Sequence, residues 1–527
     1  MKKNVIKLSF SFLALSYFSL TFGQVDKSVL NWYNGKGAGM QTEKAYKKLK
    51  NKPTTTVIVA VIDSGIDIEH QDLEGKIWVN AKEIPGNGID DDKNGYIDDI
   101  HGWNFLGNPS GQNQNDACLE KTRIYKKLRN KYDDIEASEV KSTDIAEYEL
   151  FIKVKKEVRE EKDQYDQILQ QMDQLPMILS VIPGMVETVI GKKEYTLKDL
   201  ENWKPSDEQN MQIKQMAIAM KTGELSLDVI NEQKAQLQSM LEYNLNVEFN
   251  DREFIGDDPY DFNDTKYGNN DVEGPDALHG THVGGIIGAI RGNNLGGDGV
   301  ATDIKLMSLR AVPNGDEQDK DIALAIRYAV DNGAMIINMS FGKGYSPNQK
   351  EVYEAFQYAD SKGVLLVHAA GNDAANVDIN DNYPTSMYSF QTEKLDHFLT
   401  IGASTRFPKE KLAADFSNYG QTKVDVFAPG HDIYNSVPQS EYKKLNGTSM
   451  AAPMVAGVAA MLKSYFPKLS MLEIKEIMLK TATSYKGSKQ ILPGSSDLTD
   501  FAKLSVTGSV INVYAAVKSC MTLEASK

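Results

Sequence analysis

The run VIVAVID, residues 57–63, is a continuous apolar stretch rich in β-branched side chains, and it ends on the carboxylate of Asp63. Strands that are buried on both faces of a parallel sheet show such unbroken runs, whereas half-exposed strands alternate apolar and polar residues. The run therefore predicts a buried strand of a parallel sheet. Functional side chains gather where such strands end, which makes Asp63 a candidate site residue.

Residues 304–312, 334–341, 364–370 and 424–429 predict more parallel strands. Helical stretches are predicted at 321–332 and 350–363, between the first three of these strands. Alternating strands and helices are typical of an α/β fold. We expect a doubly wound parallel sheet with helices on both faces and a functional site at its carboxyl edge.

A second feature of the sequence is a serine at the predicted start of a helix. The stretch GTSMAAP, residues 447–453, opens an apolar helix over 454–462, so Ser449 lies at a helix N-terminus. The first backbone N–H groups of a helix lack intrahelical partners, and the helix dipole favours negative charge there, so an oxyanion beside Ser449 would be stabilised. The ordinary alternative is a serine that only caps the helix.

A histidine begins another glycine-rich helix, HGTHVGGIIG at residues 279–288, whose glycines allow neighbouring backbone to approach closely. Together, Asp63, His279 and Ser449 supply an acid, a base and a nucleophile for nucleophilic hydrolysis. We interpret the neighbouring His282 as structural. The HxxH spacing comes without the HExxH pattern or a second Cys/His cluster, which argues against a zinc site.

These motifs, in the order Asp, His, Ser, resemble the subtilisin-like serine proteases, the subtilase or peptidase S8 family. The resemblance extends to VLLVHAAGN at 364–372, where it implies that Asn372 donates to the oxyanion and that the residues before it bind substrate. It also extends to IINMSFG at 336–342, similar to the family strand that pairs with an extended substrate. The implied substrate-binding residues are Ser340, Phe341, Gly342, Ala369, Ala370 and Gly371. Taken singly, Asp63 could be a strand-end cap, His279 a buried structural histidine and Asn372 a left-handed turn residue.

Asp63 and His279 are 216 residues apart, whereas most subtilases separate these two residues by a few tens. We expect a catalytic domain over 24–106 and 254–527, interrupted by a helical insertion over 107–253. Apolar residues from Phe151 to Leu175 recur at steps of three and four, which predicts a long amphipathic helix that Pro176 ends or kinks. Further helices are expected near 207–222 and 226–243. The insertion is either a lid or exosite near the cleft, or a surface decoration or protein-docking arm.

An acidic loop, DDDKNGYIDD at 90–99, has the spacing by which an EF-hand presents alternate oxygen ligands. Its expected calcium ligands are the side chains of Asp90, Asp92, Asn94 and Asp98 and the carbonyl of Tyr96. The twelfth position is His101 instead of the usual glutamate, and an acidic turn without metal is the alternative. The resemblance separately implies Asp72 as a structural-calcium ligand, with Asn293 as its candidate partner. No organic cofactor is expected.

Composition favours an exported enzyme. The chain has 527 residues, 41% of them hydrophobic, and a formal net charge of −15, which argues against nucleic-acid binding. Residues 1–23 are typical of a signal peptide, with a retained membrane anchor as the alternative, so the protein is expected in the periplasm, on the cell surface or outside the cell. No integral membrane segment is expected after cleavage. Pairing of Cys118 with Cys520 is left open.

The sequence therefore predicts a secreted serine endopeptidase that hydrolyses peptide bonds in proteins or peptides through an acyl-enzyme on Ser449. A docking partner for the helical insertion is a further hypothesis. The alternatives are an inactive or zymogen-like subtilase fold used as a binding or scaffold protein, and an esterase of the α/β-hydrolase type. The esterase is disfavoured because Ser449 lacks the GxSxG setting.

Overall fold

The predicted strand at 57–63 is the centre of the fold. The computed structural model describes residues 29–223 and 225–527, so the predicted signal peptide lies outside the described residues. Strand β1 (Val57–Asp63) pairs in parallel with β3 (Ile304–Arg310) on one side and with β4 (Ile336–Met339) on the other. Every β1 residue except Ile58 is buried, as the apolar run predicts.

The sheet has nine strands in the order β10-β13-β7-β6-β5-β4-β1-β3-β2, and all neighbours are parallel except β10 and β13. The other strands are β2 (Gly102–Asn104), β5 (Leu365–Ala369), β6 (Phe398–Ser404), β7 (Val426–Pro429), β10 (Thr483–Ser484) and β13 (Ser509–Val510). Four predicted strands are confirmed as β3, β4, β5 and β7. Strand β6, between β5 and β7, was not predicted.

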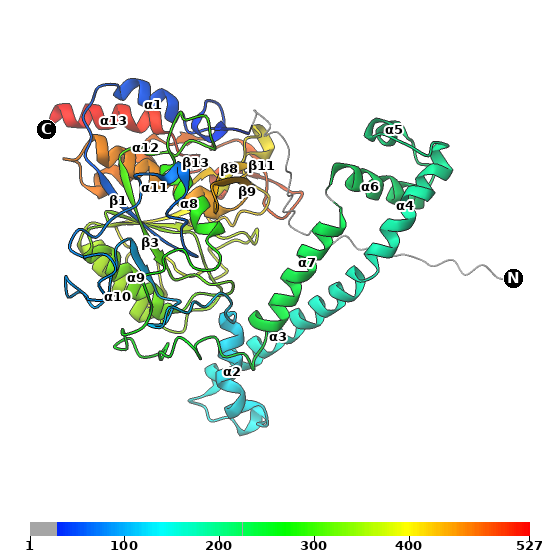
Figure 1. Ribbon diagram of the computed structural model, residues 1–527, viewed down its shortest axis with the longest axis horizontal. Coiled ribbons are helices and arrows are strands. Elements are labelled where there is room, and N and C mark those ends of the chain that lie inside the picture. Colours follow the sequence, from blue (N-terminus) through cyan, green and yellow to red (C-terminus); the bar gives the residue numbers. More distant parts are fainter. Residues whose placement is uncertain (1–28, 224) are drawn as a thin grey trace. The chain divides into compact units, whose positions relative to one another are not determined.

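Helices cover both faces of this sheet (Figure 1). Val57, Val59 and Val61 of β1 share one core with α8 (Leu278–Gly288) and α11 (Thr448–Tyr465). Ala60 and Ile62, which point the other way, share a second core with α9 (Asp319–Asp331) and α10 (Gln349–Ser361). The first face also carries α1 (Thr42–Leu49), α12 (Met471–Thr481) and α13 (Val513–Ser526). The predicted doubly wound α/β fold is confirmed.

Residues 107–253 contain the helices α2 (Glu120–Tyr132), α3 (Ile145–Met172), α4 (Leu175–Ile190), α5 (Leu197–Asn202), α6 (Glu208–Thr222) and α7 (Leu227–Ser239). The predicted long amphipathic helix is α3, and it ends just before Pro176, which sits in the first turn of α4, where a proline is tolerated. The helices expected near 207–222 and 226–243 are α6 and α7. Helices α2, α4 and α5 were not predicted.

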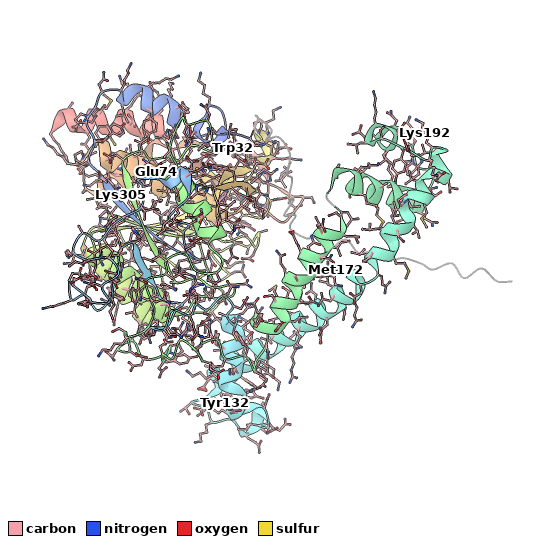
Figure 2. The ribbon with its side chains drawn as sticks, in the orientation of Figure 1. Trp32, Glu74, Tyr132, Met172, Lys192 and Lys305 are labelled. Atoms are coloured by element: carbon pink, nitrogen blue, oxygen red, sulfur yellow. The ribbon has the colours of Figure 1, made fainter. Side chains whose placement is uncertain are left out.

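The chain divides into two compact units. The smaller comprises Asp163–Ser239, and the larger holds the sheet together with α2 and α3 as far as Lys162. In the smaller unit, Met172 and Leu179 pack with α7 at Ile230 and Leu237 (Met172 is labelled in Figure 2). The limits of the predicted insertion, 107–253, stay a prediction, since the separate unit is shorter than that range.

Helix α2 is fixed to the sheet unit by buried charges. Glu120 pairs with Arg123 at 2.6 Å and with Lys343 at 2.8 Å, and Lys343 also pairs with Asp319 at 2.9 Å. Burial alone would raise the pKa of Glu120, but the attraction of Arg123 and Lys343 lowers it to about 2. Tyr132, labelled in Figure 2, packs against Phe151 and so joins α2 to α3.

Two further observations complete the description. In the described part of the chain, no single helix has the length and hydropathy to cross a membrane; one bent pair, α3 with α4, meets the test by length and composition only. Cys118 and Cys520 are both buried and free, so they do not pair.

Candidate active site

Asp63 and His279 meet at the carboxyl end of β1. The Nδ1 atom of His279, in the first turn of α8, lies 2.7 Å from Oδ1 of Asp63. The same carboxylate oxygen accepts a hydrogen bond from the backbone N–H of Ser64 at 2.8 Å. The Asp63 side chain is only 2% exposed, whereas that of His279 is 37% exposed. The imidazole of His279 therefore contacts a buried carboxylate through Nδ1, and the side chain is partly accessible to solvent.

A glycine makes this approach possible. A Cβ atom on Gly280, the neighbour of His279, would lie 2.1 Å from the carbonyl oxygen of Gly65 and 3.2 Å from Cβ of Asp63. Any larger residue would thus push the start of α8 away from the end of β1. The expectation that glycines in 279–288 permit close backbone contact holds at this position.

The Asp63 carboxylate changes the acidity of His279. Burial of the ring lowers the pKa of His279, but the charge of Asp63 and its hydrogen bond raise it by more, so the net pKa lies above the ordinary histidine value. A base of this kind is stabilised in its protonated form, which is the form it takes after it accepts a proton from a hydroxyl.

Ser449 is the second residue of α11, directly after Thr448, and it is partly exposed. Its Oγ donates a hydrogen bond to the carbonyl oxygen of Ser340 at 3.1 Å, and the Ser340 hydroxyl donates in return to the Ser449 carbonyl at 2.9 Å. Within the described residues, Ser449 makes no hydrogen bond to His279. Asp63 and His279 are thus in direct contact, whereas the Ser449 hydroxyl bonds to the carbonyl of Ser340.

Two hydrogen-bond donors lie beside Ser449 without partners among the described residues. They are the backbone N–H of Ser449 and the side-chain Nδ2 of Asn372. A Cβ atom on Gly447 would lie 3.5 Å from the first nitrogen and 3.6 Å from the second, so the absent side chain leaves space between the two donors. Thr448 fixes the Asn372 amide, because its N–H and hydroxyl both donate to Oδ1 of Asn372, at 2.8 and 3.0 Å.

The segment that contains Ser340, Phe341 and Gly342 continues directly from β4. Ser340 and Phe341 are buried and Gly342 is exposed. The neutral ring of His368 in β5 donates through Nε2 to the Phe341 carbonyl at 2.8 Å, and burial lowers the pKa of His368 to about 4. Phe341 is thus held from the β5 side.

The second predicted substrate-binding segment lies at the end of β5. Ala369 and Ala370 are buried, and Gly371 donates its N–H to the Thr448 hydroxyl at 3.0 Å. Asn382 was not predicted. Its amide donates to the Ala370 carbonyl at 3.0 Å, and its Oδ1 lies 3.1 Å from where a Cβ of Gly342 would stand, so it lies between the two segments. No spacing in the sequence marks this residue.

His282 lies on α8 one turn after His279 but faces elsewhere. It is fully buried, and its Nε2 lies within hydrogen-bond distance of two carbonyl oxygens in the hairpin of β8 (Ile433–Val437) and β9 (Glu441–Leu445), at 3.2 and 3.1 Å. Burial lowers its pKa to about 3. A neutral ring that donates to carbonyls agrees with the structural interpretation.

The acidic loop brings together a set that differs from the EF-hand prediction. The carboxylate oxygens of Glu83, Asp90 and Asp92 lie within 4.8 Å of one another. Glu83 is 6% exposed, and its Oε2 has no hydrogen-bond partner among the described residues. Asp98 does not join this set, because its carboxylate accepts from the backbone N–H groups of Gly86 and Gly88, at 2.9 and 2.8 Å.

Two other predicted ligands of this loop have identifiable contacts. Asn94 accepts from the Tyr96 N–H at 2.8 Å and donates to Asp99 at 2.8 Å. The Tyr96 ring packs edge-on against Trp103 and Tyr328. Both side chains therefore support the turn. Glu83 was missed from the sequence because it lies outside the 90–99 spacing.

The second predicted metal position, Asp72, is fully buried. Asn293 donates to its Oδ1 at 2.6 Å, so the structure brings together the two residues that the resemblance pairs. Its Oδ2 has no hydrogen-bond partner among the described residues. Burial raises the pKa of Asp72, against the opposing effect of the Asn293 hydrogen bond.

A parallel doubly wound sheet with an acid, an imidazole and a serine at its carboxyl edge defines a class of serine hydrolases. The model of the subtilase family, peptidase S8, matches residues 54–497 of this chain. The chain therefore belongs to the subtilase family.

Individual proteins and one solved structure are similar to parts of this chain. A thermophilic serine proteinase of Bacillus sp. (strain AK1) is 36% identical over 230 residues, 44% of this chain and 52% of that protein. Subtilisin DY of Bacillus licheniformis is 35% identical over 208 residues, 39% of this chain and 70% of that protein. A solved structure described as proteases from Pseudoalteromonas arctica PAMC 21717 has 27% identity and a TM-score of 0.39, and the match covers 49% of this chain and 80% of that one. The chain thus spans about half the length of the thermophilic proteinase.

Proposed function

We propose that the protein is a subtilisin-like serine endopeptidase with Asp63, His279 and Ser449 as its catalytic triad. The observation that carries this proposal is the 2.7 Å contact between His279 and the buried Asp63, at the same sheet edge as a serine flanked by two unpartnered donors. Family membership supports it, because subtilases hydrolyse peptide bonds.

The roles follow from the contacts. Asp63 accepts a hydrogen bond from Nδ1–H of His279, which leaves Nε2 free as the base. His279 takes the Ser449 hydroxyl proton as Oγ attacks the substrate carbonyl carbon, and returns the proton to the leaving amine. The Ser449 N–H and the Asn372 amide donate to the tetrahedral oxyanion in the space beside Gly447.

Substrate binding itself prepares the nucleophile in this scheme. The Ser340 carbonyl, which holds the Ser449 hydroxyl in the free protein, is also the atom expected to accept a substrate backbone N–H. When a peptide takes that acceptor, the Ser449 hydroxyl loses its partner and can turn to His279. Hydrogen bonds of this kind often tighten only in the substrate complex.

The substrate is a protein or peptide bound in extended form beside Ser340, Phe341 and Gly342. Main-chain hydrogen bonds supply recognition that does not depend on sequence, and the space around Asn382, Ala369, Ala370 and Gly371 sets side-chain preference. No organic cofactor takes part in the scheme.

We also propose a structural calcium ion on the acidic loop. Its residues fit a hard cation, because three carboxylates converge and the buried Oε2 of Glu83 is otherwise unsatisfied. Glu83, Asp90 and Asp92 are the proposed ligands. Asp98 supports the loop through backbone N–H groups, and Asp72 with Asn293 forms a second, separate candidate. The ion would stabilise the folded state and is not needed for chemistry.

Export is part of the proposal and rests on the sequence of residues 1–23. It places the enzyme in the periplasm, on the cell surface or outside the cell. One relative, 36% identical over 216 residues, is named a cell wall-associated protease of Bacillus subtilis (strain 168). A docking partner for the helical segment 107–253 stays a prediction, as do its roles as a lid or exosite.

The proposed chemistry is tested with a fluorophosphonate probe, which reacts with activated serines, on purified wild type and the Ser449→Ala and His279→Ala variants. Labelling of the wild type that Ser449→Ala abolishes and His279→Ala strongly reduces would support the triad. A folded wild type that neither reacts with the probe nor cleaves an unfolded protein would favour the inactive scaffold.

A further inference from the structure

A groove of about 830 Å³ lies in the sheet unit. Its walls are α2, the N-terminal part of α3 and three loops: one that follows β4, one that follows β5 and one that contains Tyr260. The apolar residues that line it include Ile124 and Leu128 of α2, Leu150 of α3, and Ile379. The loop that follows β4 contributes Gly344, Tyr345, Ser346 and Pro347, which come directly after the proposed substrate-binding segment.

The proposed substrate-binding segment and the two residues after it, 340–344, have an unpaired backbone edge. This edge runs from Ser449 to the groove. Lys343 and Tyr383 exchange backbone hydrogen bonds of 2.9 and 2.8 Å in an antiparallel bridge, so Lys343 faces inward. Gly342 and Gly344, on either side of it, are exposed, and their N–H and C=O groups bond to no other described residue. Alternate residues of a strand face opposite partners, so these two glycines present an unpaired edge.

This edge fixes which part of a substrate would reach the groove. The residue opposite Ser340 lies at the attacked carbonyl, because Ser340 contacts Ser449. For a substrate that pairs with this edge in the antiparallel direction, every second residue bonds, so Gly344 would stand opposite about the fifth residue before the scissile bond. The groove begins there and continues away from Ser449.

The charged side chains of the walls already have partners. Glu157 accepts from the Tyr345 hydroxyl at 2.9 Å and lies 3.9 Å from Lys153, whose ammonium lies 5.0 Å from the centre of the Tyr345 ring. Lys127 likewise lies over the Tyr260 ring at 4.1 Å.

The other acidic groups of the groove have partners as well. Glu147 pairs with Lys131 at 3.0 Å, and the Tyr383 hydroxyl donates to the carboxylate of Asp381. In contrast, Ile379 is 80% exposed. An occupant that covers apolar surface is therefore favoured over one that brings charge.

We propose that this groove is a distal subsite of the enzyme, which holds an apolar side chain of a polypeptide substrate at about the fifth residue or further before the scissile bond. The inference rests on the proposed function and extends it. Helices α2 and α3, which belong to the segment 107–253, line one side of this subsite, so that segment takes part in substrate selection.

The test compares two fluorogenic peptides with the same residues around the scissile bond. The short peptide has about four residues before the bond, and the long one has about nine, with leucines in the added part. For the wild type we expect a value of kcat/KM at least about tenfold higher for the long peptide, since burial of one apolar side chain supports such a factor. Aspartates in place of the added leucines should remove the advantage.

Ile379→Asp is the diagnostic variant, because an exposed side chain can change without loss of folding. It should reduce the long-to-short ratio to near one and leave kcat/KM for the short peptide unchanged. Val506→Asp is the matched control: Val506 is an exposed apolar residue, 46% accessible, that does not line the groove, and this variant should keep the full ratio.

The outcomes separate this subsite from the activity itself. Equal rates for both peptides in the wild type, or a length advantage that survives Ile379→Asp, would overturn the subsite while Ser449-dependent cleavage still supported the protease. If the wild type cleaved neither peptide and did not react with the fluorophosphonate probe, the proposed function would fail and the subsite with it.

Discussion

Asp63 and His279 are 216 residues apart in the chain, yet Oδ1 of one lies 2.7 Å from Nδ1 of the other. Their contact depends on a single glycine, Gly280, whose missing side chain lets α8 start against the end of β1. The second carboxylate oxygen of Asp63 is buried and has no hydrogen-bond partner in the described part of the chain. The negative charge therefore acts mainly on His279.

We predict that Asp63→Asn lowers both the activity and the pKa of His279. The carboxylate raises this pKa above about 6.5, so its removal should shift the histidine titration, and the acid limb of kcat/KM, to lower pH. Activity near neutral pH should fall about 10⁴-fold, the loss typical when a triad acid becomes an amide that favours the wrong tautomer.

NMR titration of His279 in the Ser449→Ala background measures the shift without autolysis. Asp276→Asn is the control, since Asp276 has a weaker effect on the same pKa. A His279 pKa that did not fall in Asp63→Asn would contradict the role given to this carboxylate.

The two ends of the Asn372 side chain have different roles, and a substitution can separate them: Nδ2 is the proposed oxyanion donor, and Oδ1 accepts from Thr448. Asn372→Asp keeps the oxygen that accepts from Thr448 but replaces the amide donor with negative charge. We expect kcat to fall by at least about 10²–10³-fold, the range known for loss of such a donor in a subtilisin. The midpoint of thermal unfolding should change little. If the turnover number of Asn372→Asp equalled that of the wild type, the oxyanion site would have to lie elsewhere.

His282 makes folding stability depend on pH. Its folded pKa, about 3, lies below the unfolded value of about 6.5, so the unfolded chain binds a proton first as pH falls. The free energy of unfolding should decrease below about pH 6.5, by up to about 1.4 kcal/mol per pH unit for this residue. His368, with a pKa of about 4, acts in the same direction.

Urea unfolding of Ser449→Ala at several pH values between about 8 and 5 measures this slope. His282→Gln keeps a side-chain N–H donor but cannot titrate. The slope of the unfolding free energy against pH should therefore become smaller by the contribution of one bound proton. An unchanged slope would mean that His282 is already protonated when folded.

Calcium should raise the unfolding temperature through Glu83. We predict that a chelator lowers the melting temperature of Ser449→Ala, and that calcium at about 100 times its Kd restores about 2.7 kcal/mol. Glu83→Gln should abolish the part of this response that comes from the acidic loop, and any remainder would point to Asp72. Asp98→Asn should destabilise the loop with or without calcium, because Asp98 contacts backbone N–H groups. A full calcium response in Glu83→Gln would remove Glu83 from the proposed ligands.

The strand at 57–63 could be predicted because its apolar run is unbroken up to Asp63, and the strand at 364–370 because only His368 interrupts an apolar run between two glycines. Strand β6 was missed although all seven of its residues are buried. Its run FLTIGAS contains Thr400 and Gly402, and the glycine is required by contact with the Phe427 ring of the neighbouring strand β7, where a Cβ would lie 2.7 Å away. That requirement arises from tertiary packing and leaves no local signal.

The proposed triad could be named from short motifs because each motif carries its residue in a fixed local setting. Glu83, Asn382 and Lys343 could not be named in this way. Glu83 lies outside the 90–99 spacing, and Asn382 contacts Ala370 at the end of β5. Lys343 has its partner, Glu120, in a segment far away in the chain. Local spacing reports which element a residue belongs to, but not which distant side chain it will meet.

The position of β1 in the sheet has a consequence for the order of folding. Both strands that pair with β1 follow it by more than 200 residues; for example, Arg310 of β3 donates to the Ser64 carbonyl 246 residues earlier. Such pairing gives a high contact order, and long-range parallel strands are slow to form. Residues 163–239, in contrast, build their core from helices close together in sequence. During synthesis this helical unit can fold while β1 still has two unpaired edges, so the slowest and most aggregation-prone step is expected to be the closure of the sheet around β1.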